Sequence, residues 1–193
     1  MNSLAYALLS VLTRESMSGY DLMLRIQPFW QAKHSQIYPL LSKMEQAGYV
    51  EHILVEQSDK PDKKVYSSTE AGLSALRDWL SQPSADLVTR DEMLIKVYAS
   101  WLGDRAELRR HLEDRIVACQ KRLRHLEGLR DKYSSDFQAD AGAMDLLSPA
   151  FSSYILIRRS LQIVNSDLEW CHWVLELLMQ QELASGTDMT STT

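Results

Sequence analysis

The 193-residue sequence has only two cysteines and few chain-breaking residues. Two cysteines cannot supply the disulfide framework of a small secreted domain, so we expect a cytoplasmic protein. Seven glycines and five prolines are few for this length, which favours long helices over many turns. No apolar run reaches the roughly 18 residues of a membrane span. We therefore expect no membrane partner.

Signatures of catalysis and metal binding are also missing. The sequence contains no His-Glu-x-x-His motif, no Cys-x-x-Cys motif and no glycine-rich loop that could hold a phosphate. His111 and His125 share one face of a predicted helix, but they lie about 21 Å apart along its axis. Cys171 and His172 are neighbours and would point about 100° apart on a helix. We expect no metal, no cofactor and no enzymatic activity.

The chain has fewer basic than acidic residues, but one stretch of it carries only basic charges. The net charge is −5, and residues 1–80 carry eight basic and nine acidic side chains. Net charge says little about any one face of a protein. Between Asp21 and Glu45, every charged side chain is basic, namely Arg25, Lys33 and Lys43. This local excess keeps nucleic acid open as a partner.

The first 81 residues predict a winged helix-turn-helix domain. Apolar spacing predicts helices over about residues 3–13, 19–26, 36–47 and 70–80. Ser18, Ser35 and Thr69 are the expected N-caps, and Gly48 is expected to end the third helix. Strand-like composition over Val50–Gln57 and Lys63–Ser68 predicts a hairpin with a basic tip. Three helices, a hairpin and a helix are the winged helix-turn-helix order.

The third predicted helix has two different faces. Ile37, Leu41 and Met44 form an apolar stripe, while the other face is polar and almost free of acid. A helix that only packs does not need such a second face. On pattern alone, an ordinary solvated face remains an alternative.

A second, helical domain is expected over residues 91–181, after a linker over residues 82–90. It begins with a helix over about residues 91–102. Two long amphipathic helices follow, starting near Asp104 and Pro149 and joined by a loop over residues 134–148. Residues 182–193 are expected to be disordered.

The long helices carry apolar stripes with a seven-residue rhythm, which favours coiled-coil-like antiparallel packing. Two such helices cannot bury both stripes fully by themselves, so we expect a homodimer. The predicted dimerisation residues are Leu108, Leu112, Ile116, Cys119, Leu123, Leu126, Leu161 and Leu168. The expected fold class is thus mainly α with a small β-hairpin: an N-terminal winged helix-turn-helix plus a C-terminal antiparallel helical dimerisation domain.

Six short motifs occur in a fixed order: Ser18-Gly19-Tyr20-Asp21, Tyr38-Pro39-Leu40-Leu41, Met44-Glu45, Gly48-Tyr49-Val50, Lys63-Lys64-Val65-Tyr66 and Thr69-Glu70-Ala71-Gly72. In this combination they resemble the PadR family of bacterial transcriptional regulators. The C-terminal half resembles the helical dimerisation domain of the longer members, the group with the phenolic-acid regulator and the virulence regulator AphA. Lys63 stands where the family often has Arg, and Ser68 where an apolar residue is usual. Lysine cannot contact a phosphate with two parallel bonds, so we expect weaker backbone contact by the wing.

The resemblance implies a recognition helix in the major groove and a wing along the backbone. It also implies a homodimer, a repressor in our interpretation, on a palindromic site in double-stranded DNA. Gln36 would read a base edge, and Lys43 would contact a phosphate. The predicted DNA-binding residues are Lys33, Ser35, Gln36, Tyr38, Pro39, Lys43, Lys60, Lys63, Lys64 and Tyr66.

An effector site is a further expectation from the resemblance, since some members bind small aromatic molecules. Trp79, Tyr98, Trp101 and Arg158 could line such a site, although packing in a core or dimer interface is the simpler explanation of the aromatic residues, and Arg158 could instead form an ion pair across the dimer. Two other functions remain open. One is a winged helix that binds proteins without DNA, and the other is an aromatic-ligand sensor for which DNA binding is secondary.

Overall fold

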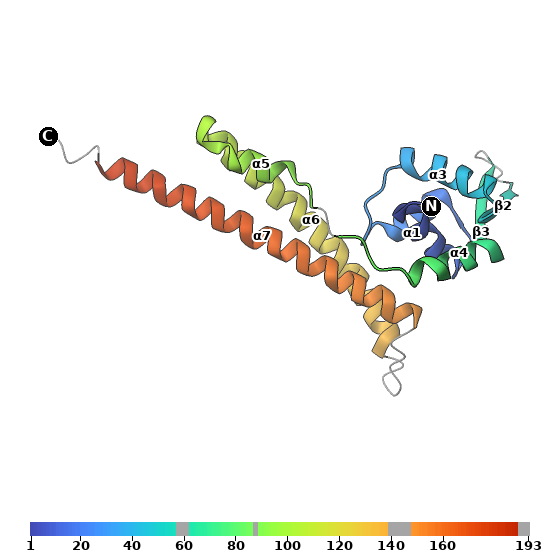
Figure 1. The fold of residues 1–193 in the computed structure, drawn as a ribbon. Coiled ribbons are helices and arrows are strands. Elements are labelled where there is room, and N and C mark those ends of the chain that lie inside the picture. Colours follow the sequence, from blue (N-terminus) through green and yellow to red (C-terminus); the bar gives the residue numbers. More distant parts are fainter. Residues whose placement is uncertain (57–61, 87–88, 139–147, 189–193) are drawn as a thin grey trace. The chain divides into compact units, whose positions relative to one another are not determined.

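The computed structural model describes residues 1–56, 62–86, 89–138 and 148–188 (Figure 1). The chain divides into two compact units, Met1–Asp86 and Leu87–Thr193. Among the described residues, no helix or strand lies between Leu80 and Glu92. The structure is mainly helical with one small sheet, which confirms the predicted fold class.

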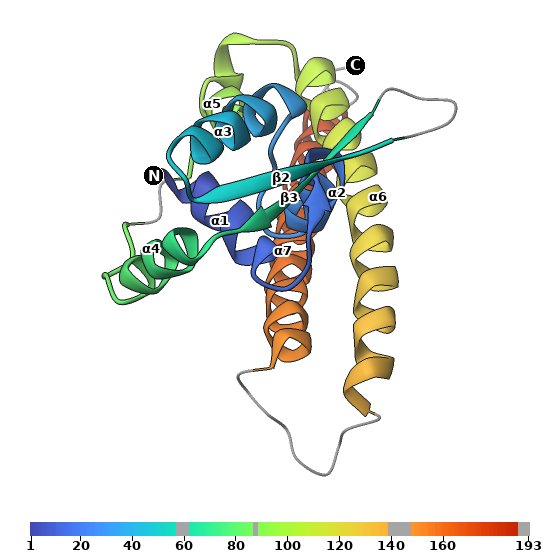
Figure 2. The same ribbon diagram turned by 90° about the vertical axis from the view of Figure 1, so that its right-hand side faces the viewer.

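The N-terminal unit has the predicted order of elements, with one addition. It consists of α1 (Ser3–Leu12), β1 (Met17–Ser18), α2 (Gly19–Ile26), α3 (His34–Gln46), β2 (Val50–Val55), β3 (Lys63–Ser68) and α4 (Glu70–Leu80). The addition is β1, which pairs with β3 through Met17 and Tyr66 and gives an antiparallel sheet of order β1-β3-β2. Two residues are too short a run for alternation to predict a strand, so only the hairpin of β2 and β3 was expected (Figure 2).

The core of this unit lies between its helices. Most of the fully buried side chains come from α1, α2 and α3, and among them are Leu8, Leu9, Leu22, Ile26, Ile37 and Leu41. Ile37, Leu41 and Met44 are the predicted apolar stripe of α3. Because that stripe faces the core, the opposite face of α3 is left to solvent.

The ends of the helices largely follow the predicted caps. The Ser18 hydroxyl accepts a hydrogen bond from the Asp21 backbone N–H, and Thr69 Oγ1 accepts one from the Gly72 N–H. Gly48 has a φ of +74°, which suits the left-handed residue after a helix.

The start of α3 differs from the prediction. The helix begins at His34, with Lys33 as its N-cap residue, instead of after Ser35. The Lys33 backbone N–H donates to Gln36 Oε1 at 3.0 Å, so the glutamine three positions on closes this end of the helix. Ser35 therefore lies in the first turn of α3 and is not its N-cap residue.

The C-terminal unit is a hairpin of two long helices preceded by a short one. Its elements are α5 (Glu92–Tyr98), the 3-10 turn η1 (Ser100–Leu102), α6 (Arg105–Gln138) and α7 (Pro149–Asp188). Figures 1 and 2 show α6 and α7 running side by side. Early residues of α6 pack with late residues of α7 in one cluster, and the reverse holds in a second cluster, so the two helices are antiparallel.

Three predicted boundaries in this unit are corrected. The helix expected over 91–102 ends at Tyr98 and continues as η1. The loop expected over 134–148 is helical through Gln138, and the tail expected to be disordered from 182 is helical through Asp188. Neither extension contains a proline, and tertiary contacts along a long helix carry its ends further than local composition indicates.

An ion cluster attaches the start of α5 to the hairpin. Arg115 Nη2 lies 2.7 Å from Asp91 Oδ2 and 3.2 Å from Asp167 Oδ2, so one guanidinium joins three elements. Its hydrogen bond to Asp91 is the main cause of a raised pKa for Arg115, and the same bond lowers the pKa of Asp91. Asp91 also accepts from the Met93 N–H and caps α5.

Candidate nucleic-acid interface

The solvent-facing side of α3 carries most of the residues predicted to bind DNA. Its exposed members are Lys33, Ser35, Gln36, Tyr38, Pro39 and Lys43. No acidic side chain lies among them, and the first acid in α3 is Glu45, near the end of the helix. This face is therefore open to solvent, polar and basic, as a surface for phosphates requires.

Two details of this face were not predictable from spacing. Gln36 has its side-chain oxygen occupied by the Lys33 N–H, so pairing with the edge of an adenine would require it to leave that bond. Pro39 lies in the second turn of α3, inside the helix. Because proline has no N–H, the carbonyl of Ser35 receives no helical hydrogen bond from it.

The wing residues divide into different roles. Lys63 Nζ lies 2.9 Å from Asp21 Oδ2, so this lysine ties β3 to α2 and is not a free cation for DNA. Tyr66 is only 4% exposed, so its predicted contact with DNA is corrected to a place in the core. Burial, followed by the charge of Glu45, raises the pKa of Tyr66. Lys64 is exposed, while Lys60 lies outside the described residues.

Glu45 connects the end of α3 to the wing. His52 Nδ1 on β2 lies 2.7 Å from Glu45 Oε1, and Lys64 Nζ on β3 lies 3.9 Å from Glu45 Oε2. This carboxylate therefore holds the hairpin against the predicted recognition helix. This link was not predicted from the sequence, because Glu45 meets His52 and Lys64 only after the hairpin folds back against α3.

The Asp21–Lys63 pair predicts an acid-sensitive contribution to stability. A hydrogen bond from Ser18 and then the contact with Lys63 hold the pKa of the Asp21 carboxyl below its usual value. A lowered folded-state pKa stabilises the fold above the unfolded-state pKa, and this contribution disappears as the pH falls through the folded value. Asp21→Asn should therefore lower the melting temperature at about pH 7 by roughly 2–4 °C, and the difference should shrink as the pH falls below the usual pKa range of a carboxyl group.

Thermal unfolding at several pH values measures this effect. The matched control is Asp78→Asn, which removes an exposed aspartate of α4. The control should follow the wild-type pH profile. If Asp21→Asn also follows it, Lys63 is free in solution and its assignment to DNA contact is restored.

The predicted dimerisation residues lie inside the C-terminal hairpin. Leu108, Leu112 and Ile116 pack with Cys171 and Val174 in one buried cluster. A second cluster contains Leu126 and Leu161, with Cys119, Leu123 and Leu168 packed against it. The stripes of α6 and α7 thus cover each other within one chain, and other apolar side chains of this unit remain exposed.

The four residues predicted for an effector site are not gathered around the hollow found in the C-terminal unit. Trp79 stacks on Tyr6, with ring centroids 4.5 Å apart, in the N-terminal unit. Tyr98, Trp101 and Arg158 are exposed. A hollow of about 350 Å³ is instead lined by Lys96, Ala99, Ser100, Leu102, Gly103, Asp104, Glu107, Leu108 and His111.

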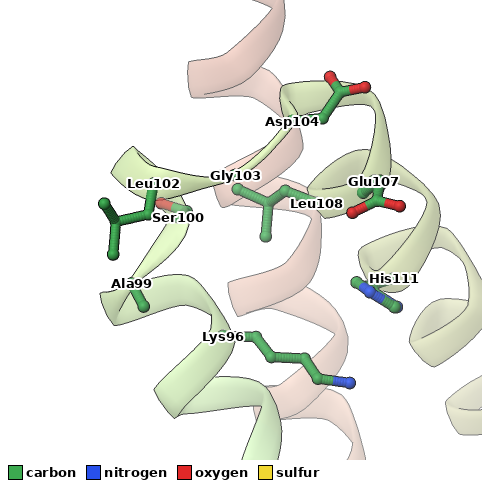
Figure 3. Close-up of a pocket in the computed structure, with 9 residues that line it drawn as sticks. All are labelled: Lys96, Ala99, Ser100, Leu102, Gly103, Asp104, Glu107, Leu108 and His111. Carbon is green, nitrogen blue, oxygen red and sulfur yellow. The ribbon is translucent and has the colours of Figure 1, made fainter.

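Figure 3 shows the ends of Lys96 and His111 on the same side of this hollow. Lys96 is already paired with Glu92 at 2.9 Å, and Asp104 uses its carboxylate to cap α6 through the Ala106 N–H. The other ionisable side chains of the lining are Glu107 and His111. This hollow therefore lacks the convergent set of polar groups that is typical of a ligand site.

Comparison with known proteins supports the assignment of both units. The family model "Transcriptional regulator PadR-like family" matches residues 8–78, and "Virulence activator alpha C-term" matches residues 89–179. The negative transcriptional regulator PadR of Bacillus subtilis is 32% identical over 184 residues, covering 92% of this chain and 98% of that protein. The chain belongs to the PadR-like family of transcriptional regulators.

Solved structures of PadR-like regulators share the fold. PadR of Bacillus subtilis in complex with operator DNA has a TM-score of 0.72 at 30% identity, covering 92% of this chain and 98% of that one. The same protein in complex with p-coumaric acid has a TM-score of 0.62 at 27% identity, covering 92% and 99%. The Vibrio cholerae virulence activator AphA has a TM-score of 0.69 at 28% identity, covering 93% and 99%.

Family membership confirms two predictions made from the sequence. The resemblance to the longer PadR-type regulators is correct, and the chain is a transcriptional regulator and not an enzyme. Among the described residues, no helix combines the length and hydrophobicity needed to cross a membrane.

Proposed function

We propose that this PadR-like regulator is a cytoplasmic repressor that binds a palindromic operator as a homodimer. The observation that carries the proposal is the solvent-facing side of α3, which is exposed and basic while the opposite stripe is held in the core. A helix fixed in this way can enter a major groove without rearranging the domain. The complex of the Bacillus subtilis relative with operator DNA supports this role, and that relative's name supports repression.

Dimerisation is supported by exposed apolar side chains at the start of the C-terminal unit. Five large ones lie within nine residues of α5 and η1, namely Leu94, Ile95, Tyr98, Trp101 and Leu102. Contiguous exposed apolar surface commonly marks a protein–protein interface. We propose that this surface, which we call the α5/η1 patch, contacts a second copy. The α6 and α7 stripes, which the sequence assigned to the dimer, then stabilise each protomer.

Two substitutions on α3 test the mode of DNA binding. Lys43→Ala should remove one phosphate contact, which weakens binding to all duplexes by about 3- to 10-fold and reduces the salt slope by about one. Gln36→Ala should instead relax the preference at one base position, at a cost of about 1–3 kcal/mol for the preferred base. Mobility-shift titrations at two salt concentrations, with operator and random duplexes, measure both effects.

The matched control is Lys121→Ala, which removes an exposed lysine from α6. It should bind operator like the wild type. If Lys43→Ala and Lys121→Ala give equal affinities and equal salt slopes, α3 is not the DNA-binding surface. If the wild-type protein shifts no duplex at either salt concentration, a protein-interaction role replaces the proposal.

An aromatic effector is a second element of the proposal, and the p-coumaric acid complex of the Bacillus subtilis relative supports it. We expect an acid of this class to reduce operator binding in the same mobility-shift assay. Unchanged binding at saturating p-coumaric acid would contradict control by this ligand without affecting the assignment of α3.

A further inference from the structure

Three aromatic rings form a column on the surface where α2 meets α3. Tyr20 and His34 have ring centroids 5.8 Å apart with an interplanar angle of 21°, and His34 and Tyr38 are 6.0 Å apart at 9°. All three side chains are exposed, with Tyr20 at 50% and Tyr38 at 46%. Aromatic rings with a polar tip are enriched at interfaces, so an exposed stack on the proposed DNA-binding face is suited to contact with a partner.

Gly19 determines where this column stands. A Cβ atom at position 19 would lie 2.8 Å from Tyr38 Cε1 and 3.3 Å from Leu41 Cδ1. The Tyr38 ring can therefore lie against the backbone of α2 only because residue 19 has no side chain. The Tyr38 ring in turn holds one face of the imidazole of His34.

Both tyrosine rings stack on the imidazole, Tyr20 from α2 and Tyr38 from α3. The two nitrogens lie in the plane of the imidazole ring, so their hydrogens point away from the faces of the stacked rings. The two ring contacts thus hold the imidazole in a fixed orientation as a hydrogen-bond donor.

The charged groups of α3 near His34 are basic. Lys33 precedes it, Tyr38 stacks on it, and Lys43 is the next charged group along the helix. The acid of this helix, Glu45, lies near its far end and is bound by His52 and Lys64 of the wing. On α3, therefore, no acidic side chain other than the already paired Glu45 could form an ion pair with protonated His34.

The charged groups of α2, which packs against α3, are already engaged. The Asp21 carboxylate is held by the Ser18 hydroxyl and by Lys63. Arg25 lies 3.5 Å from Glu15, which precedes α2. The acid of α2 is thus paired with a lysine and does not compete with DNA for a charged His34.

We propose that His34, stacked with Tyr20 and with Tyr38, contacts a DNA phosphate in its protonated form. This contact rests on the proposed function, and it adds a residue that neither the motif pattern nor the predicted contact set included. Imidazole is the side chain that changes charge between about pH 5 and pH 8. Operator affinity should therefore rise as the pH falls through this range.

The test measures operator affinity of the full-length protein at about pH 6 and pH 8, each at two salt concentrations. The wild type should bind about 3- to 10-fold more tightly at the lower pH, with a salt slope steeper by about 0.9. His34→Gln should lose both differences. His34→Lys should bind tightly at both pH values, because its charge does not titrate in this range.

His125→Gln is the matched control, since it removes an exposed histidine from α6, which is not part of the proposed DNA-binding face. It should keep the wild-type pH dependence. The inference is overturned if His34→Gln retains that dependence or if His125→Gln removes it. Absence of operator binding by the wild type at both pH values would instead contradict the proposed function itself.

Discussion

Gly72→Ala is expected to unfold the N-terminal unit or to destabilise it by roughly 3 kcal/mol or more. A Cβ atom at position 72 would lie 2.2 Å from the Tyr49 carbonyl oxygen and 3.1 Å from Leu9 Cδ1. The oxygen cannot move away easily, because it accepts a hydrogen bond from the Thr69 N–H at 3.2 Å. The methyl group would therefore force α4 away from the end of α3 and from α1.

This prediction also gives a physical reason for the Thr69–Gly72 motif. Thr69 caps α4 through the Gly72 N–H and donates its hydroxyl to the Gly48 carbonyl, so the first turn of α4 is attached to the end of α3. That attachment brings two backbones into contact at position 72. Urea unfolding followed by circular dichroism and tryptophan fluorescence measures the effect.

Gly128→Ala is the matched control for this substitution. Gly128 lies inside α6, and a Cβ atom added there would have no neighbouring atom within 4 Å among the described residues. Alanine should therefore leave stability unchanged or raise it by up to about 1 kcal/mol. A Gly72→Ala protein that unfolds at the wild-type urea concentration would mean that α4 does not pack against Tyr49 in solution.

The double substitution Ile95→Glu with Leu102→Glu should convert the proposed dimer into monomers and reduce operator affinity by about 100-fold or more. The two side chains are 68% and 72% exposed in the protomer, so charges at these positions should leave the fold of one chain intact. In the α5/η1 patch they would be buried against the second copy, where unpaired carboxylates are costly. Loss of the second recognition helix removes an avidity gain of about 10² to 10⁴.

Sedimentation measures the oligomeric state, and mobility shift measures the affinity. The control is Gln120→Glu with Gln162→Glu, which places the same two charges on exposed positions of α6 and α7. This control should remain dimeric. A dimer that survives the Ile95 and Leu102 substitutions would place the interface outside the α5/η1 patch.

Several features of the site followed from residue pattern because they are local. The stripe of Ile37, Leu41 and Met44 predicted which face of α3 is buried, since helical periodicity alone decides which residues share a face. The caps at Ser18 and Thr69 were predictable for a similar reason, because a cap bonds to a backbone group three residues away.

Features that join distant segments could not be predicted in this way. Lys63 was expected to meet DNA, but it contacts Asp21, 42 residues earlier in the chain. Tyr66 was predicted to contact DNA as part of the Lys63–Tyr66 motif, yet pairing of β3 with β1 and with β2 places it in the core. The stacked column of Tyr20, His34 and Tyr38 likewise depends on the packing of α2 against α3.

The amino-acid sequence by itself determined the family, the order of the elements and the polar face of α3, because these depend on motifs, caps and periodicity within short segments. Only the tertiary structure decided which of the basic side chains are free to meet DNA and which apolar side chains remain for a partner. The reason is that a side chain engaged in an ion pair or in a packed stripe is not available to DNA or to a second copy, and its partner lies far away in the sequence. Lys63 and the stripe of α6 are two such cases.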